Sequence, residues 1–163
     1  MSTYFNKDFF LNYGYQIIDS LFSNVQCDKL IYEVNNLQSN DYTPLMNKHF
    51  ESEEILKFIS QKKLVNIVEE YFSGKAMGLQ TEFFFMPPST QGFSPHQDNT
   101  FVQAKGNTFV SAWVALTDVD PINGGLIIWP ETHKEKQIDF EETGENTIDN
   151  QDPNANKLKT VIP

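Results

Sequence analysis

The sequence contains no arginine, and all of its twelve basic side chains are lysines. Aspartate and glutamate number 22, so the formal net charge is −10 at pH 7. Proteins that bind a nucleic-acid backbone need clusters of basic side chains to neutralise the phosphates. An acidic chain without arginine is therefore not expected to bind nucleic acid.

Cysteine and long apolar runs are also scarce. The single cysteine, Cys27, cannot form a disulfide within the chain, which excludes a disulfide scaffold and fits a reducing compartment. No apolar run approaches the roughly 18 residues of a membrane-spanning helix. The first ten residues lack the basic start and apolar core of a secretory signal. We therefore expect a cytoplasmic protein that does not enter a membrane.

Aromatic residues are abundant at 13% of the chain, with fourteen phenylalanines, and can supply a packed core. A chain of 163 residues has the size of one domain. Residues 1–76 are predicted to be helical. Asn6 can cap a first short helix and Gly14 can end it. Apolar residues at three- and four-residue spacing predict a helix that starts after a cap at Ser23 or Asn24 and ends at about residue 37, and two more at 53–60 and 62–72.

The pattern changes near residue 77, where extended segments replace helices. Residues 118–125 between two of them are rich in turn formers. Residues 131–152 hold eight acidic residues and two lysines, which predicts a long exposed loop. Strands are predicted at 80–86, 108–116, 126–129 and 157–162. Helices followed by strands favour an α+β fold in which helices pack on an antiparallel sheet.

The most informative stretch is residues 94–100, SPHQDNT. In an extended segment, residues two apart face the same side, so His96 and Asp98 can present a nitrogen and a carboxylate oxygen to one point. A second histidine from elsewhere would complete a 2-His-1-carboxylate iron(II) site with open positions. The H-x-D spacing alone has a substantial false-positive risk. The alternative is a surface histidine hydrogen-bonded to a nearby aspartate.

Four motifs in order give this stretch a context. They are His96-Gln97-Asp98, Trp113-Val114-Ala115-Leu116, Asn123-Gly124-Gly125 and Pro130-Glu131-Thr132-His133-Lys134. In this order the sequence resembles the phytanoyl-CoA dioxygenase family of iron(II)/2-oxoglutarate oxygenases. The resemblance covers nearly the whole chain, and the ordered set is far more specific than any one motif.

The resemblance implies a single domain whose N-terminal helices pack on a double-stranded β-helix, the cupin-like jelly roll. Residues 1–76 would be the helical support, and 77–163 the first part of the jelly roll with its acidic loop at 131–152. The family also needs a distal histidine as third iron ligand and an arginine that binds 2-oxoglutarate. We expect both beyond residue 163, so that these 163 residues are the N-terminal portion of the enzyme and are inactive alone.

The resemblance also assigns roles to individual residues. An aspartate at position 98 favours hydroxylation, because a halogenase of this family leaves that coordination position for halide. Asn99 and Phe101 directly follow the metal motif and are the first candidates for substrate contact. For Trp113 a position in a buried strand is the alternative, and for Gln80 an outward-facing strand position. The implied iron ligands are His96 and Asp98, and the implied 2-oxoglutarate contacts are Gln80 and Trp113.

The other two histidines and the cysteine receive structural interpretations. His133 aligns with a turn histidine of the family that is not a ligand. His49 falls in a polar loop, where a solvated histidine is expected and a role near the substrate is the alternative. Cys27 lies on a predicted helix among apolar neighbours and is interpreted as a packing residue.

The function implied is hydroxylation of a small molecule, coupled to decarboxylation of 2-oxoglutarate and using O2 and iron(II). The sequence does not identify the substrate or the oligomeric state. Two other hypotheses stay open at this point. One is a non-catalytic small-molecule or metal-binding module of the same fold, and the other is an interaction protein whose acidic loop binds a basic partner.

Overall fold

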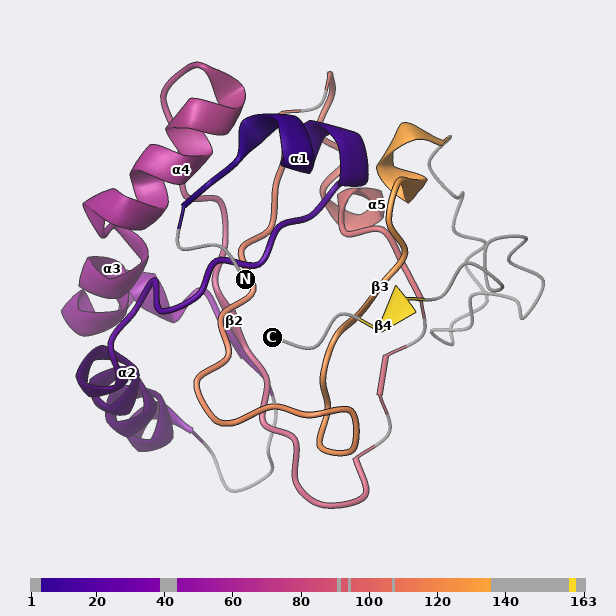
Figure 1. The fold of residues 1–163 in the computed structure, drawn as a ribbon. Helices are drawn as coiled ribbons and strands as arrows, with labels where there is room; N and C mark the ends of the chain where they lie inside the picture. The colour runs from indigo at the N-terminus through magenta and orange to yellow at the C-terminus, as the bar shows by residue number, and fades with distance from the viewer. Residues whose placement is uncertain are drawn as a thin grey trace. The chain divides into compact units, whose positions relative to one another are not determined.

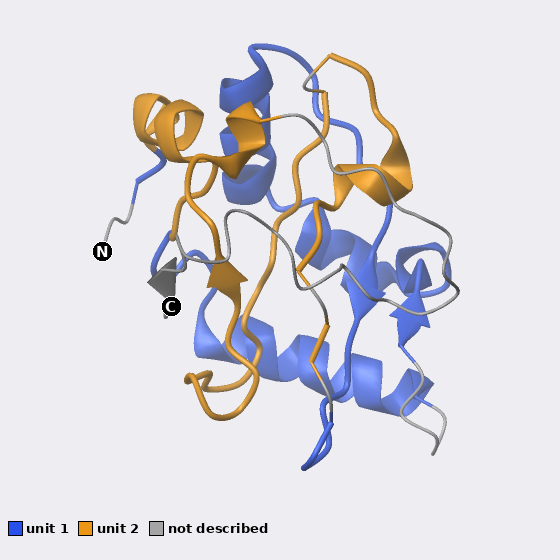
Figure 2. Cartoon of the chain, turned by 90° about the vertical axis from the view of Figure 1, so that its right-hand side faces the viewer, with its two compact units in different colours: residues 1–5, 18–90 blue, residues 6–17, 91–163 orange. Residues whose placement is uncertain are grey.

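The structure of this chain is a computed structural model (Figure 1). It describes residues 4–38, 44–90, 92–93, 95–106, 108–135 and 159–160. The chain divides into two compact units (Figure 2): unit 1 comprises residues 1–5 and 18–90, and unit 2 comprises residues 6–17 and 91–163. The single domain with a helical part at 1–76 stays a prediction.

Unit 1 contains three of the predicted helices. Helix α2 (Asn24–Leu37) begins with a capping box, in which the Ser23 side chain accepts from the Gln26 N–H and the Gln26 side chain accepts from the Ser23 N–H. Helices α3 (Glu53–Ile59) and α4 (Lys62–Phe72) follow. All three lie within one residue of their predicted bounds. Serine side chains cap the starts of α2 and α3, whereas α4 has no side-chain cap and its apolar periodicity specifies it.

The core of unit 1 forms between α2 and α3. The ring centroids of Phe22 and Phe58 stack 4.1 Å apart. The Ser52 hydroxyl caps α3 and donates to the Glu33 carboxylate of α2 at 2.5 Å, which ties the two helices together. The buried apolar residues are Phe22, Leu30, Val34, Leu45, Ile55 and Phe58.

A short antiparallel ladder completes unit 1. Strand β1 (Leu45–Met46) pairs with β2 (Glu82–Phe83), with Leu45 opposite Phe83. A 3-10 turn, η1 (Lys48–Phe50), follows β1 directly. Of the predicted strand at 80–86, only the two residues of β2 are paired in the part that the structure describes.

Unit 2 begins with α1 (Lys7–Tyr13), as predicted. The Asn6 side chain accepts from the Phe9 N–H at 2.9 Å, and Gly14 ends the helix with φ +80°. Further along the chain lie α5 (Asn99–Val102) and the 3-10 turn η2 (Thr132–Lys134). Strand β3 (Ile127–Ile128) pairs antiparallel with β4 (Lys159–Thr160).

The turn predicted at 118–125 is confirmed. The Asp120 carboxylate accepts from the N–H groups of Ile122 and Asn123 at 2.7 and 2.9 Å. The strand predicted at 108–116 is wrong for its described residues, which are irregular. Strand propensity takes effect only where a neighbouring strand accepts the backbone hydrogen bonds.

The helices and short antiparallel ladders agree with the predicted α+β class, and the jelly roll stays a prediction. Each sheet in the described ranges has two strands. Most of the predicted acidic loop at 131–152 lies outside the described residues. Among the helices that the structure describes, none combines the length and apolar character needed to cross a bilayer.

Candidate metal centre

The structure brings His96 and Asp98 together. Their Nε2 and Oδ1 atoms lie 3.3 Å apart. The backbone, however, is not extended at Asp98, where φ is −53° and ψ is −35°. The prediction of an extended segment is therefore wrong at this residue. A tight turn into α5 achieves the convergence that side-chain alternation along a strand was expected to produce.

Asn99 stabilises the short helix that follows Asp98. Its side-chain oxygen accepts from the Ala104 N–H at 2.9 Å, and its amide donates to the Ala104 carbonyl at 3.1 Å. The chain leaves the helix at Gln103 in the left-handed region, with φ +55°. These bonds give Asn99 a local structural role, and its contact with substrate stays a prediction.

The two oxygens of the Asp98 carboxylate have different partners. Oδ1 faces His96, and Oδ2 accepts a hydrogen bond from the Ser111 hydroxyl. The hydrogen bond with His96 lowers the pKa of the Asp98 carboxyl, partial burial opposes this, and the bond from Ser111 lowers the pKa further. The pKa of Asp98 is lowered overall, so the carboxylate is ionised at neutral pH.

The pair fits two adjacent ligands of one divalent cation. Ligands at right angles on an octahedral ion are about 3 Å apart when each bond is about 2.1 Å long. The observed 3.3 Å separation is close to that spacing, and a nitrogen with a carboxylate oxygen is a donor set that iron(II) accepts. The His96 and Asp98 side chains are 34% and 50% exposed, so an ion can reach them. The alternative is that this contact is an ordinary hydrogen bond between a surface histidine and a nearby aspartate, with no metal role.

A third donor is not present beside this pair in the described part of the chain. No group of three or more histidine, cysteine, aspartate or glutamate residues suited to a metal occurs there. The described residues thus provide two donors of the predicted three. The position of the third ligand, expected beyond residue 163, stays a prediction.

Two aromatic residues of the predicted site lie at the surface. The Phe101 ring contacts the His96 ring edge-to-face, with centroids 5.7 Å apart, and Phe101 is 63% exposed. Trp113 is also exposed, and it lies in the irregular segment rather than in a buried strand. Phe101 therefore positions the imidazole on one side, whereas the 2-oxoglutarate contact of Trp113 stays a prediction.

Gln80 belongs to unit 1. It directly precedes the buried Thr81, and its own side chain is exposed. The Gln80 amide donates to the Glu82 carboxylate on β2. The outward-facing strand position weighed for Gln80 agrees with this exposure, and its role toward 2-oxoglutarate stays a prediction.

His133 is held at the end of α1. Its Nε2 lies 2.9 Å from the Leu11 carbonyl oxygen, and the Glu131 N–H donates to the Tyr13 carbonyl at 2.9 Å. Gly14 lies so close to the ring that a Cβ there would be 2.3 Å from His133 Nδ1. The histidine of the Pro130–Lys134 motif thus fastens η2 to the first helix of unit 2.

His49 is buried, at 8% exposure, which makes the prediction of a solvated histidine wrong. Its Nδ1 forms a hydrogen bond of 2.8 Å with the Thr81 hydroxyl. The Asn47 N–H also donates to the Thr81 carbonyl at 2.7 Å. His49 lies in η1 and Thr81 directly precedes β2, so the contact joins residues 32 positions apart. No local sequence pattern marks such a contact.

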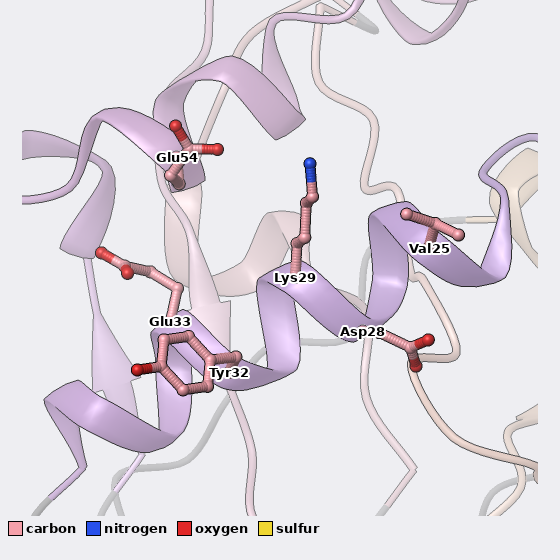
Figure 3. Close-up of a pocket in the computed structure, with 6 residues that line it drawn as sticks. All are labelled: Val25, Asp28, Lys29, Tyr32, Glu33 and Glu54. Carbon is pink, nitrogen blue, oxygen red and sulfur yellow. The ribbon is translucent and has the colours of Figure 1, made fainter.

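A shallow hollow of about 610 Å³ lies on unit 1 (Figure 3). Five of its lining residues project from α2 and one from α3. They are Val25, Asp28, Lys29, Tyr32, Glu33 and Glu54. None of them is a predicted site residue, so this hollow is not the candidate metal centre.

Curated relatives of the chain include several dioxygenases. The peroxisomal phytanoyl-CoA dioxygenase of Bos taurus is 30% identical over 89 residues, covering 52% of this chain and 26% of that protein. The probable alpha-ketoglutarate-dependent hypophosphite dioxygenase of Stutzerimonas stutzeri is 23% identical over 160 residues, covering 83% and 56%. The chain thus spans about a quarter to a half of these relatives' length. No solved structure matches it significantly.

The match to a family is broader than any of these pairwise similarities. The sequence model of the family described as Phytanoyl-CoA dioxygenase (PhyH) matches residues 10–161. This range includes the His96–Asp98 pair, the 118–125 turn and the 130–134 motif. Because the match extends over nearly all of the 163 residues, the chain belongs to the phytanoyl-CoA dioxygenase (PhyH) family.

Proposed function

We propose that this chain is part of an iron(II)- and 2-oxoglutarate-dependent dioxygenase that hydroxylates a small-molecule substrate. The observation that carries the proposal is the 3.3 Å approach of His96 Nε2 to Asp98 Oδ1 within the H-x-D motif. Membership of a dioxygenase family supports it, as does the name of the alpha-ketoglutarate-dependent relative. Iron(II) and 2-oxoglutarate are the cofactor and cosubstrate that the family implies.

His96 and Asp98 would hold the metal through Nε2 and Oδ1. Bound iron would supply the activation of O2, with 2-oxoglutarate as the source of two electrons. The protein's own contribution is to fix the two donors. The turn into α5 positions Asp98, and the Phe101 ring packs against His96. Because a carboxylate occupies position 98, we propose hydroxylation rather than halogenation.

The remaining parts of the site are included in the proposal as the family implies them. Gln80 and Trp113 would contact 2-oxoglutarate, while Asn99 and Phe101 would face the substrate. We propose that these residues belong to a jelly-roll domain. The third iron ligand, the arginine for 2-oxoglutarate and the cytoplasmic location stay predictions.

Turnover of 2-oxoglutarate tests the proposal. The protein expressed from its whole reading frame should convert 2-oxoglutarate to succinate when iron(II) and O2 are present, and His96→Ala should abolish this. His133→Ala is the matched control, because it removes an imidazole that lies outside the pair, and it should retain turnover. Unchanged turnover in His96→Ala would remove the metal role from this histidine.

One observation favours a second candidate, a non-catalytic metal- or small-molecule-binding module. The described residues supply two donors and not three. Such a module would bind a divalent cation through His96 and Asp98 but would not consume 2-oxoglutarate. Measuring cation binding and turnover on the same preparation separates the two functions.

A further inference from the structure

We propose that Ser111 is a positioning residue for Asp98, a role that rests on the metal function proposed above. Ser111 lies 13 residues after Asp98 and donates its hydroxyl hydrogen to Asp98 Oδ2. It neither belongs to the H-x-D motif nor supplies a ligand. Its task is to hold the carboxylate so that the other oxygen, Oδ1, faces the metal position.

The division of the carboxylate between two partners is the basis of this inference. Oδ1 lies 3.3 Å from His96 Nε2, and Oδ2 is occupied by the hydroxyl of Ser111. A carboxylate that is free to rotate about its last bond can present either oxygen, or both, to a cation. With Oδ2 engaged, Asp98 would donate through one oxygen only. A single-oxygen ligand leaves more positions around the ion open for cosubstrate and O2.

The local backbone explains why a second anchor is needed. Asp98 lies at the start of a helix of four residues, and its side chain makes no capping bond with the backbone of that helix. Asp98 is half-exposed, so packing alone does not fix its rotamer. Hydrogen bonds to ligating carboxylates typically change metal affinity by about 10- to 100-fold. Ser111 is placed to supply such a bond.

A purely structural bond would have a different consequence. The Ser111–Asp98 contact also joins the segment after α5 back to the H-x-D turn, and its loss could change stability without affecting a metal. Metal affinity therefore has to be measured together with stability. The substitution Ser111→Thr retains a hydroxyl at this position, whereas Ser111→Ala removes it. The two variants therefore differ in whether they can donate a hydrogen bond to the Asp98 carboxylate.

The test is titration of the protein expressed from its whole reading frame with manganese(II), followed by the electron paramagnetic resonance signal of the free ion. Asp98→Ala should abolish saturable binding. Ser111→Ala should weaken it about 10- to 100-fold, and Ser111→Thr should remain within about threefold of the unaltered chain. The matched control is Ser60→Ala, which removes a hydroxyl that donates to the Leu56 carbonyl at 2.6 Å on unit 1 and should leave binding unchanged.

The outcomes separate this inference from the proposed function. If Asp98→Ala abolishes binding and Ser111→Ala does not weaken it, the inference is wrong and the metal site stands. If Ser111→Thr binds as weakly as Ser111→Ala, the hydroxyl is not the relevant group and the inference is also wrong. If the unaltered protein from the whole reading frame shows no saturable binding, the proposed metal site fails and the inference fails with it. A melting curve for each variant confirms that the compared proteins are folded.

Discussion

The two units of this molecule differ in how they are held together. The nine residues that are recorded as buried, six apolar and three polar, all belong to unit 1. In unit 2, by contrast, every residue from 6–17 and 92–135 whose burial is described is at least partly exposed, and hydrogen bonds hold its segments to each other. The H-x-D pair and Ser111 lie in unit 2. The comparison indicates that packing stabilises one unit, whereas the candidate chemistry depends on a network of surface hydrogen bonds in the other.

The largest expected effect is a cavity in the core of unit 1. Ile55 is fully buried, so Ile55→Ala should lower the free energy of unfolding by about 2–5 kcal/mol. Leu56→Ala, at the next and exposed position, is the matched control and should cost far less. Urea denaturation followed by circular dichroism measures both. Equal costs at the two positions would contradict the assignment of the core to this face of α3.

The next effect concerns the junction of α1 and η2 in unit 2. Gly14→Ala should lower the free energy of unfolding by about 2–3 kcal/mol, because a left-handed backbone disfavours alanine and the new Cβ would displace the His133 ring. Gly106→Ala isolates the backbone contribution, since Gly106 also has positive φ but has nothing within 4 Å of an added Cβ. Thermal melts should show the larger loss for Gly14→Ala. In a His133→Ala background the difference between the two glycines should shrink, and a constant difference would exclude the ring contact as its cause.

The third effect addresses the polar part of the unit 1 core. Thr81→Val removes the hydroxyl that pairs with His49 Nδ1 at 2.8 Å and leaves a buried polar atom without its partner. We expect a loss of about 1–2 kcal/mol in the free energy of unfolding. Thr90→Val removes an exposed hydroxyl that donates to the Pro87 carbonyl and should cost less. A similar loss for both variants would mean that burial of the His49–Thr81 pair is energetically unimportant.

The smallest effect is a change in thiol reactivity. Partial burial raises the pKa of the Cys27 thiol, and the nearby Asp28 carboxylate raises it further. A raised pKa leaves less thiolate at any given pH, so iodoacetamide should react more slowly with Cys27 than with a free cysteine. The reaction should become half-maximal at a higher pH, and Asp28→Asn should move that midpoint part of the way back. A rate equal to that of the urea-unfolded chain would contradict the effect of burial.

The sequence was sufficient to predict a structural feature where the residues that form it lie close together in the chain. The Asn6 cap, the Gly14 exit and the turn at Asp120 all act within about four residues, and each was found as expected. Contacts between distant residues were not predictable in this way. Buried His49 pairs with Thr81, 32 residues later, and the local sequence around neither residue indicates this hydrogen bond.

The candidate metal centre shows both what a sequence motif can predict and what it cannot. The identity of His96 and Asp98 followed from a motif and a family resemblance, whereas the backbone that brings them together was mispredicted as extended. Ser111 was not identified from the sequence, because its bond to Asp98 spans 13 residues of irregular chain. A motif specifies which atoms can serve as donors, but tertiary hydrogen bonds determine how they are oriented.

The most direct test of the central claim is a crystal structure of the protein expressed from its whole reading frame and soaked with manganese(II), with the ion located by its anomalous scattering. The account predicts one ion within about 2.0–2.3 Å of both His96 Nε2 and Asp98 Oδ1. Asp98 Oδ2 should remain hydrogen-bonded to the Ser111 hydroxyl. An ion bound elsewhere, or a His96 and an Asp98 that point apart with no ion between them, would contradict it.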